Sequence, residues 1–236
     1  MLLSIITINL NNAEGLRRTL RSIGPLLSDQ VEHIVIDGQS SDSSGEVIAQ
    51  YTAGRSHVRT ICECDTGIYN AMNKGIDLAR GHYIAYINSG DEAIPDAYAR
   101  YLDVIGSRRS DVFYAKTQVR PIDEQPVFIH ERHPDKLYRD TLPHLTCAVR
   151  KSVLQQLQGF DESYRICADR DLMIRLQQAN ASFSFHDDVV SIFELGGVSS
   201  GRSTKMENLE INRKHRFIGL LRYHLKRGLY RLKSKA

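Results

Sequence analysis

The chain has 236 residues, 42% of them hydrophobic and 25% charged, which is the composition of an ordinary soluble globular protein with room for one large or two small domains. Four cysteines, at positions 62, 64, 147 and 167, are too few for a disulfide framework, and Cys62-Glu63-Cys64 lacks the two-residue gap of a zinc knuckle, so we expect reduced thiols in or near the core. The opening MLLSIITINL lacks a basic region and a cleavage site, and no apolar run reaches the roughly 18 to 20 residues of a membrane span. These features predict a cytoplasmic protein.

Charge is unevenly distributed along the chain. Residues 213–236 carry nine Lys or Arg and no acid, and removing these nine from the 31 basic residues leaves 22 against 28 acidic residues. A body of net charge −6 therefore carries a +9 tail, which indicates an anionic partner for the tail.

The first hundred residues alternate between predicted strands and helices. Short apolar runs, typical of buried parallel strands, occur at residues 2–8, 33–36, 58–62 and 82–88. Helical patterns with apolar side chains on one face separate them at residues 16–27, 44–51 and 68–79. Strands separated by helices in this way predict βαβ units and a parallel sheet.

The second half of the chain gives a more mixed pattern. It predicts strands at residues 111–116, 127–130 and 146–149, with a polar loop at 130–142. It also predicts helices at 152–158, ended by Gly159, and at 168–178.

Polar side chains follow the predicted strands at equivalent points. Asn9 follows the first strand, and Asp37, Asp65 and Asp91 follow the next three. Because ligands bind at the carboxyl edge of parallel strands, this pattern predicts a ligand site at that edge. Several carboxylates at one edge repel each other unless a metal ion, or a ligand with donor groups such as a nucleobase N–H, lies among them.

The nature of that ligand is narrowed by missing motifs. No GxGxxG or GxxxxGK[ST] follows any predicted strand, which disfavours the dinucleotide fold and the P-loop NTPases. A phosphate-bearing ligand would then need a metal, and Asp91 is the natural residue to hold Mg²⁺ or Mn²⁺ together with phosphate oxygens and water. Gly90 lets the backbone approach the ligand closely.

The predicted helix at 168–178 carries two acids in its first turn. Placement of acid against the helix dipole accounts for one of them. Asp171 is well placed for an ion pair with Arg175, four residues later, so Asp169 is the freer carboxylate.

With these residues in hand, the sequence resembles the inverting glycosyltransferases of family 2, which have the GT-A fold. Four stretches carry the resemblance: SIITINLNN, HIVIDGQSSDSS, ECDTGIYNAMNKGIDLARGHYIAYINSGDE and GFDESYRICADRDLMIRL. The resemblance extends to LGGVSSGRS near residue 200, and the nearest likeness is to transferases that build bacterial surface polysaccharides, including those of the colanic acid type. It implies an α/β fold with a Rossmann-like, mostly parallel central sheet flanked by helices. It divides the chain into a GT-A domain at 1–212, with a nucleotide-binding half (1–116) and an acceptor-side half (117–212), and a basic amphipathic helical tail at 213–236.

The resemblance also implies roles for individual residues. Asp37 matches the acid that contacts the nucleotide base, and Asp65 matches a further nucleotide-contacting position. Asp91 matches the last aspartate of the metal motif, and Asp169 matches the general base that acts on the acceptor hydroxyl. The remaining positions implied in donor binding are Thr7, Asn9, Asn73, Lys74, Ser89 and Gly90. Gly196-Gly197-Val198-Ser199 matches a loop near the active site.

Two departures from the family pattern stand out. Where many members have Asp-x-Asp-Asp, this chain has Asn88-Ser89-Gly90-Asp91, so one carboxylate is left for the ion. The family's Glu-Asp pair reads Ala168-Asp169.

The implied activity is metal-dependent transfer of a sugar, with inversion, from a nucleotide-diphosphate donor to a hydroxyl of a saccharide acceptor. UDP is the expected nucleotide, with GDP and dTDP as alternatives, and Mn²⁺ or Mg²⁺ is the expected cofactor. The implied acceptor is linked to polyprenyl diphosphate, and no nucleic-acid partner is expected. An inactive nucleotide-sugar-binding module and a sugar-phosphate nucleotidyltransferase are the alternatives, although the early glycine-rich signature of the latter is missing.

The tail has its own periodicity. Ile218, Leu221, Leu225, Leu229 and Leu232 recur at spacings of three and four residues, with basic residues on the flank and the opposite side. Such a helix either packs on the body with a solvated basic face or lies on the anionic cytoplasmic leaflet. We favour the second reading, which makes the protein peripheral on the inner face of the plasma membrane.

Overall fold

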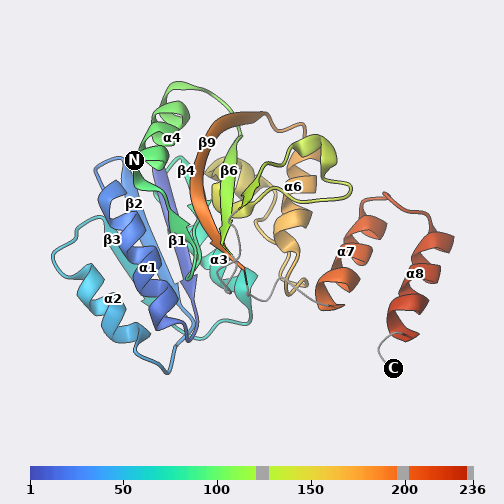
Figure 1. Cartoon of the computed structure of the whole chain (residues 1–236), viewed down its shortest axis with the longest axis horizontal. Coiled ribbons are helices and arrows are strands. Elements are labelled where there is room, and N and C mark those ends of the chain that lie inside the picture. The colour runs from blue at the N-terminus through green and yellow to red at the C-terminus, as the bar shows by residue number, and fades with distance from the viewer. Residues whose placement is uncertain (121–127, 196–201, 233–236) are drawn as a thin grey trace.

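A computed structural model describes residues 1–120, 128–195 and 202–232. The described part of the chain forms one sheet with the strand order β3-β2-β1-β4-β8-β6-β9-β5, and β7 pairs with β6 (Figure 1). The strands are β1 (Leu3–Asn9), β2 (Val31–Asp37), β3 (Val58–Cys62), β4 (Tyr83–Tyr86), β5 (Glu92–Ala93), β6 (Val112–Arg120), β7 (Phe128–His130), β8 (Ala148–Arg150) and β9 (Phe183–Glu194). The α/β fold predicted from the sequence is confirmed.

The four strands β3, β2, β1 and β4 are parallel, as the alternation of strands and helices predicts. Beyond β4 the sheet becomes mixed, because β8 runs antiparallel to both β4 and β6, whereas β9 runs parallel to β6. The parallel strands thus form the amino-terminal half of the sheet, and the antiparallel pairs belong to the second half.

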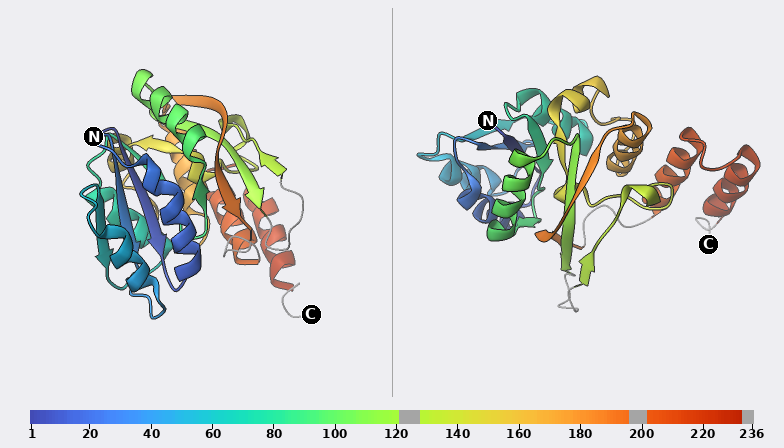
Figure 2. Two further views of the ribbon diagram at one scale, coloured as in Figure 1. Left: turned by 60° about the vertical axis from the view of Figure 1, so that its left-hand side comes forward. Right: turned by 90° about the horizontal axis from the view of Figure 1, so that it is seen from above.

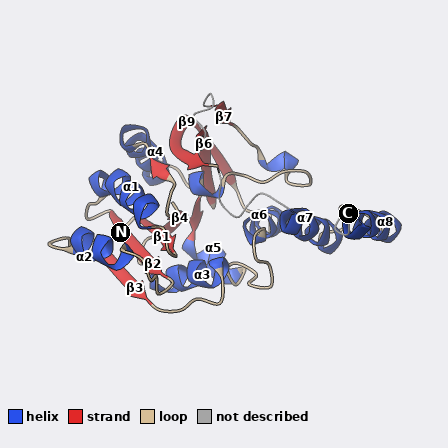
Figure 3. Cartoon of the chain, turned by 60° about the horizontal axis from the view of Figure 1, so that its bottom comes forward, coloured by secondary structure: helices blue, strands red, loops and turns tan. Residues whose placement is uncertain are grey.

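Helices cover both faces of the sheet (Figure 3). They are α1 (Ala13–Ile23), α2 (Ser44–Thr52), α3 (Ile68–Leu78), α4 (Pro95–Ser107), α5 (Lys151–Gln156), α6 (Ala168–Gln178), α7 (Arg202–Lys214) and α8 (Leu220–Leu232). Around β1–β3, the helices α1 and α2 lie on one side and α3 on the other (Figure 3).

The alternation of side chains along each strand separates two cores. Ile6 and Ile84 contribute to a cluster that includes residues of α3 and α6, whereas their neighbours Ile5 and Ala85 contribute to a cluster that includes residues of α4. Since β1 and β4 are buried on both faces, the continuous apolar runs read from the sequence are explained.

Two of the four cysteines lie where the sequence predicts. All four are free, and Cys147 and Cys167 are buried, but Cys62 and Cys64 are exposed, so the expectation of near-core thiols was wrong for that pair. Both follow or end the edge strand β3, which has a neighbour on only one side.

The last two helices project from the body (Figures 1 and 2). The Tyr223 hydroxyl of α8 donates to both carboxylate oxygens of Glu210 in α7, at 2.7 and 2.8 Å. The predicted boundary at residue 212 falls within α7, and Lys214 and His215 contact Asp171 of α6. In the described part of the chain, no helix is both long and apolar enough to cross a membrane.

Candidate active site

The carboxyl ends of the parallel strands bring the predicted polar residues together. In the strand register, Asn9 lies opposite Asp37, and Asp37 lies opposite Cys62. The loop that follows β4 joins the same edge, because the Ser89 N–H donates to the carbonyl oxygen of Ile8 at 3.2 Å.

Asp37 is the organising carboxylate of this edge. It is only 1% exposed, and it accepts hydrogen bonds from Asn9 Nδ2 at 2.7 Å, from the Ser40 N–H at 2.8 Å and from Ser40 Oγ at 2.7 Å. Burial acts to raise the pKa of Asp37, but these donors outweigh it and lower the pKa below its usual value. Asp37 is therefore held ionised, with Asn9 Oδ1 left buried and without a partner among the described residues.

Asp65 is fixed by Lys74 beside the same loop. Lys74 Nζ lies 2.7 Å from Asp65 Oδ1 and 2.8 Å from Glu63 Oε1, and it donates to the carbonyl oxygen of Cys64 at 3.1 Å. A Cβ on Gly38 would come within 3.1 Å of Asp65 Oδ2, so the loops after β2 and β3 touch here. Lys74 thus holds the loop of Asp65 with its charge.

Thr7 has its hydroxyl fully occupied inside the protein. The buried Thr7 Oγ1 donates to the carbonyl oxygen of Ile87 at 2.7 Å and lies 2.8 Å from His33 Nε2. Burial lowers the pKa of His33 to about 3, so the ring is neutral and donates from Nε2 to Thr7. The geometry gives Thr7 a role in joining β1 to the end of β4.

Asn73 clamps α3 to the loop before α6. Its Nδ2 donates to the carbonyl oxygen of Phe160 at 3.0 Å and to Glu162 Oε1 at 2.8 Å, and its Oδ1 accepts from the Phe160 N–H at 2.9 Å. Gly159 has φ +64°, and a Cβ there would lie 2.5 Å from Asn73 Oδ1, so this clamp requires glycine.

The turn at 88–91 is built by its backbone. Thr19 Oγ1 lies within 2.6 Å of the Asp91 carbonyl oxygen, to which it donates, and accepts from the Gly90 N–H at 3.1 Å. Ser89 Oγ donates to the carbonyl oxygen of Asn12 at 3.2 Å, and Gly90 adopts φ +107°, which favours glycine.

Asp91 itself is buried and short of positive charge. Its side chain accepts from the Glu194 N–H at 3.2 Å, and the residue is 6% exposed. Burial raises the pKa of Asp91 to about 7, with the carboxylates of Glu194 and Glu92 acting in the same direction. Arg18 and Arg120 lie nearby, but their ion pairs are made with Glu92 and Glu194.

The chemistry of this turn fits a hard divalent cation. Asp91 supplies a carboxylate that lacks a bonded cation, and Asn88 Oδ1 is a buried oxygen with no hydrogen-bond partner among the described residues. No group of three or more His, Cys, Asp or Glu side chains in the described ranges could hold a metal by itself. A cation here would therefore need oxygen ligands from a bound phosphate or from water.

Asp169 lies at the start of α6 and faces this turn through a histidine. Asn88 Nδ2 lies 3.1 Å from His144 Nε2, and His144 Nδ1 lies 3.8 Å from Asp169 Oδ2. The Tyr69 hydroxyl, which donates to the carbonyl oxygen of Ile166, also lies 3.4 Å from Asp169 Oδ1. The His144–Asp169 contact thus links the 88–91 turn to the predicted base.

Burial controls the charge state of both members of that contact. Burial raises the pKa of Asp169 and lowers the pKa of His144, which favours a neutral imidazole. Because Asn88 Nδ2 donates to Nε2, the ring proton sits on Nδ1 and points toward the carboxylate. A carboxylate with a raised pKa and a partly exposed side chain is the arrangement expected of a general base.

A cavity of about 370 Å³ lies near the start of α6, although Asp169 itself does not line it. Tyr69 and Ile166, which contact the Asp169 turn, contribute to its lining, as do Tyr164 and Ser203. The volume is in the range of small-molecule sites.

Asp171, two residues further along α6, has a different environment. Its fully buried carboxylate lies 2.7 Å from Arg175 Nε, 2.9 Å from Lys214 Nζ and 2.8 Å from His215 Nε2. The predicted pair with Arg175 is confirmed, and Asp171 is occupied in holding α6 to the end of α7.

Sequence reasoning missed His144 and Tyr69. His144 lies in the short 3-10 turn η3 (His144–Thr146), in a stretch that carries no periodic pattern, and the aromatic ring of Tyr69 was read only as part of a helix. Gly196-Gly197-Val198-Ser199 lies outside the described residues.

Comparison with known proteins bears on the family and the fold. The profile of the family described as Glycosyl transferase family 2 matches residues 4–168. A PGL/p-HBAD biosynthesis glycosyltransferase of Mycobacterium bovis is 30% identical over 205 residues, covering 84% of this chain and 78% of that protein. The sequence pointed to colanic-acid-type transferases, but the relative named here is mycobacterial, so that finer resemblance gains no support from it.

Two solved structures share the fold. TarS 1–349 of S. aureus in complex with UDP-GlcNAc has a TM-score of 0.71 and 16% identity, covering 91% of this chain and 65% of that chain. The mannosyltransferase PcManGT of Pyrobaculum calidifontis, in complex with GDP-Man and Mn²⁺, has a TM-score of 0.71 and 14% identity, covering 92% and 64%. The chain thus spans slightly less than two thirds of each of these structures.

Proposed function

Because this chain belongs to glycosyltransferase family 2, we propose that it transfers a sugar from a nucleoside-diphosphate donor to a hydroxyl of a saccharide acceptor, with inversion at the anomeric carbon. The observation that carries the proposal is the placement of Asp169: a carboxylate only 18% exposed, with a raised pKa, that faces His144 and through it the turn bearing Asp91. Donor phosphate at the turn and acceptor hydroxyl at Asp169 would then occupy the same carboxyl edge of the sheet.

Asp169 acts as the general base in this proposal. Its raised pKa makes the carboxylate a stronger proton acceptor than an exposed aspartate, and the ionised form accepts the proton of the acceptor hydroxyl as the new bond forms. Attack from the face opposite the leaving diphosphate inverts the configuration. His144 Nδ1 faces this carboxylate at 3.8 Å, and we propose that the ring positions Asp169 relative to the 88–91 turn.

Asp91 is the residue that would hold Mn²⁺ or Mg²⁺, with Asn88 Oδ1 available nearby. When bound, the ion would act as a Lewis acid and offset the charge that develops on the leaving nucleoside diphosphate. Among the fold neighbours, PcManGT in complex with GDP-Man and Mn²⁺ supports a divalent ion in such a site.

The nucleotide would lie against the loops after β2 and β3. Asn9, Asp37 and Asp65 gather there, and we propose that they contact the donor together with Thr7, Asn73, Lys74, Ser89 and Gly90. Asp37, Thr7 and Asn73 also have partners inside the protein, so we propose that they support the loops around the ligand in addition to contacting it. UDP remains the expected nucleotide, with GDP and dTDP as alternatives.

The acceptor is proposed to be a polyprenyl-diphosphate-linked saccharide of bacterial surface polysaccharide synthesis, reached from the inner membrane surface. Exposed leucines on α8 support this location: Leu220, Leu221 and Leu225 are 57%, 78% and 62% exposed, while Tyr223 on the same helix packs toward α7. A helix with exposed leucines and flanking basic residues gains both apolar burial and attraction to anionic lipid at a membrane surface.

Product analysis tests the proposal. The protein is incubated with UDP-, GDP- and dTDP-sugars, Mn²⁺ and a polyprenyl-diphosphate saccharide, and released nucleotide and glycosylated product are measured together. We expect nucleoside diphosphate and a new glycosidic bond in equal amounts, with inverted anomeric configuration by NMR, and no product from Asp169→Asn. Binding without turnover would indicate a nucleotide-sugar-binding module, and formation of pyrophosphate would indicate a nucleotidyltransferase.

A further inference from the structure

A second cavity, of about 680 Å³, opens at the amino-terminal edge of the parallel strands, away from the candidate active site. Leu2, just before β1, and Tyr83, the first residue of β4, line it, whereas the active-site turn begins at Asn88. Five residues of a strand separate Tyr83 from Asn88 by roughly 16 Å, at about 3.3 Å per residue. This cavity therefore lies at the opposite end of the parallel strands from the active-site turn, and it shares no lining residue with the cavity of about 370 Å³.

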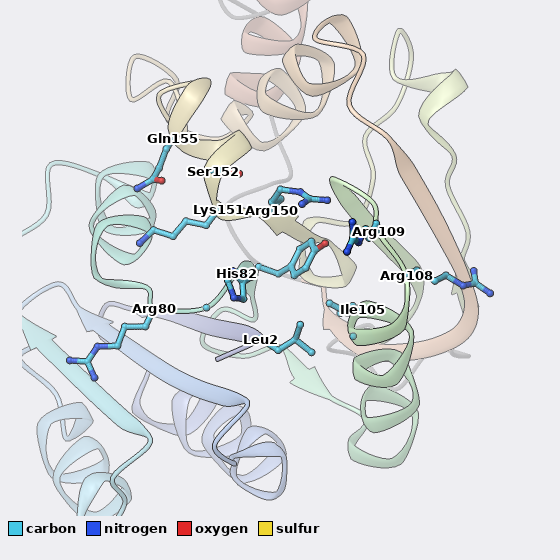
Figure 4. A pocket seen from close by; sticks show the side chains of 13 residues that line it. Leu2, Arg80, His82, Ile105, Arg108, Arg109, Arg150, Lys151, Ser152 and Gln155 are labelled. Atoms are coloured by element: carbon cyan, nitrogen blue, oxygen red, sulfur yellow. The ribbon is translucent and has the colours of Figure 1, made fainter.

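The lining of this cavity is basic. It contains six basic residues and no Asp or Glu, and these six arrive from three segments of the chain (Figure 4). They are Arg80 and His82 before β4, Arg108 and Arg109 after α4, and Arg150 and Lys151 at the junction of β8 and α5. Residues 1–212 have 22 Lys or Arg against 28 acids, so a concentration of five Lys or Arg here opposes the charge of the body as a whole.

Three of these cationic side chains are not paired with an acid in the described structure. Arg80, Arg108 and Arg109 are exposed, and none of them forms an ion pair within residues 1–120, 128–195 and 202–232. Uncompensated like charges gathered around one hollow repel each other, and an anionic ligand removes that repulsion.

The other two cations are held in position by the protein. Arg150 pairs with Asp111 at 3.1 Å, donates to the carbonyl oxygen of Ser110 at 2.9 Å and lies over the Tyr83 ring at 5.6 Å. Lys151 Nζ donates to the carbonyl oxygen of Ala79 at 2.5 Å. Two cations held by the protein thus lie beside three that are free to meet a ligand.

We propose that this cavity binds a phosphate-bearing anion with at least two charged phosphate groups or an equivalent headgroup. Guanidinium groups match phosphate oxygens in bidentate geometry, and four of the six basic residues are arginines. The volume lies within the range of small-molecule sites and exceeds what a single phosphate fills, while Leu2, Tyr83 and Ile105 supply an apolar surface for the rest of the ligand.

Inorganic pyrophosphate is the probe for the test, used with the full-length chain in EDTA, so that a metal-dependent site does not contribute. Binding is measured by calorimetry for the wild type, for the double variant Arg108→Gln/Arg109→Gln and for the matched control Arg17→Gln/Arg21→Gln, which removes two charges from α1. We expect the double variant to bind at least tenfold more weakly, since each charge-assisted hydrogen bond lost is worth about one decade or more. The control should bind as the wild type does.

Sedimentation with vesicles distinguishes the source of the phosphate. Full-length wild type and double variant are compared on vesicles with and without phosphatidylglycerol. Weaker sedimentation of the double variant assigns the site to a lipid headgroup, and equal sedimentation with weakened pyrophosphate binding assigns it to a soluble ligand. If neither pyrophosphate nor vesicles distinguish the double variant from the control, the proposal is wrong. Glycosyl transfer by the double variant should stay at the wild-type rate, so the outcome is independent of the proposed function.

Discussion

Replacing Asp171 by asparagine should destabilise the protein, whereas the same replacement of Asp169, two residues earlier in α6, should abolish turnover and leave the fold intact. Asp171 is fully buried and contacts Arg175, Lys214 and His215. Asp169 has no basic neighbour closer than His144 Nδ1 at 3.8 Å among the described residues, and its burial disfavours the charged form. An amide can replace the Asp169 carboxylate without loss of packing. At position 171 an amide leaves the basic partners of the carboxylate without their counter-charge.

The size of the effect follows from the contacts that asparagine cannot make. A hydrogen bond to a charged group contributes about 1.5 to 3 kcal/mol. In Asp171→Asn, Arg175 still donates hydrogen bonds to the carbonyl oxygens of Leu157 and Gly159. Lys214 is 40% exposed and still forms its ion pair with Asp161, so neither cation loses all of its partners. We expect Asp171→Asn to cost about 2 to 4 kcal/mol, which lowers Tm by roughly 5 to 15 °C in a chain of this size.

The pH dependence of that loss has a definite sign. Burial acts to raise the pKa of Asp171, but hydrogen bonds from His215, Lys214 and Arg175 outweigh it and lower the pKa. A carboxylate with a depressed pKa stabilises the fold above its unfolded pKa of about 3.9, and this contribution disappears as the pH falls toward the folded value. The difference in Tm between wild type and Asp171→Asn should therefore be constant from pH 8 to about 5 and shrink below about pH 4.

Thermal unfolding and steady-state transfer, measured on the same preparations, test this pair. Asp169→Asn should unfold at or above the wild-type temperature, because it removes a buried charge, and should lose kcat while donor affinity stays close to wild type. Asp171→Asn should retain transfer at a temperature where it is folded. The reasoning is refuted if Asp171→Asn has the Tm of the wild type but loses turnover, and if Asp169→Asn remains active.

Three further predictions concern the turn, the histidine and the last helix. Asp91→Asn should lower turnover by on the order of a hundredfold and weaken Mn²⁺-dependent binding of nucleoside diphosphate, and unchanged binding and rate would leave 88–91 as a structural turn. His144→Ala should lower kcat with little change in donor KM, whereas His144→Asn, which keeps a polar side chain facing Asp169, should restore part of it; equal losses in both would contradict a positioning role. Leu221→Gln/Leu225→Gln should reduce salt-sensitive sedimentation with anionic vesicles at an unchanged Tm, and equal sedimentation with wild type would exclude α8 as the membrane contact.

The last test uses substitutions because truncation would be ambiguous. A chain that ends at Asn212 loses Lys214 and His215, which contact Asp171, together with α8. Leu221 and Leu225 are exposed, so their replacement affects the surface of α8 and leaves those contacts in place.

The parallel half of the sheet was predictable because its signals are local. β1 and β2 are rich in isoleucine and valine, and the rule that parallel strands end together places Asn9 opposite Asp37 without further information. The same rule leads from the sequence to Asp91 and Asp65. These predictions depend on chain order and strand direction alone.

The elements that were not predicted have ambiguous local patterns. β9 contains His186-Asp187-Asp188 in its middle, where the pairing with β6 shifts register, so neither the alternation nor the apolar content of a strand persists along it. α7 carries few apolar residues, and several of its contacts with the body are made by polar side chains such as Glu207 and Asn212. α4 begins at Pro95, separated by one residue from the two-residue strand β5, so the sequence signals of the two elements lie side by side.

The position of His144 depends on tertiary structure only. It lies 56 residues after Asn88 and 25 before Asp169, and a buried histidine between an amide and a carboxylate leaves no periodic trace in a single sequence. Thr7 and Asn73 show the converse case: both match donor-binding positions, but their side chains already have partners inside the fold. A particular residue type can therefore be required at a motif position because its side chain supports a loop, as well as because it contacts a ligand.

Three aspartates at one edge of the sheet acquire different properties from their surroundings. Asp37 accepts from two N–H groups and a hydroxyl, and these donors keep its pKa low and the carboxylate ionised. Asp91 and Asp169 receive less support than burial requires, so both pKa values are raised. A carboxylate that lacks compensation is stabilised by a cation, and in the proposed function this cation is a metal ion at Asp91 and the proton of the attacking hydroxyl at Asp169. The number of hydrogen-bond donors around each carboxylate thus distinguishes Asp37, whose pKa is low, from Asp91 and Asp169, whose pKa values are raised. Replacing each aspartate by asparagine tests whether this difference matters for stability and for turnover.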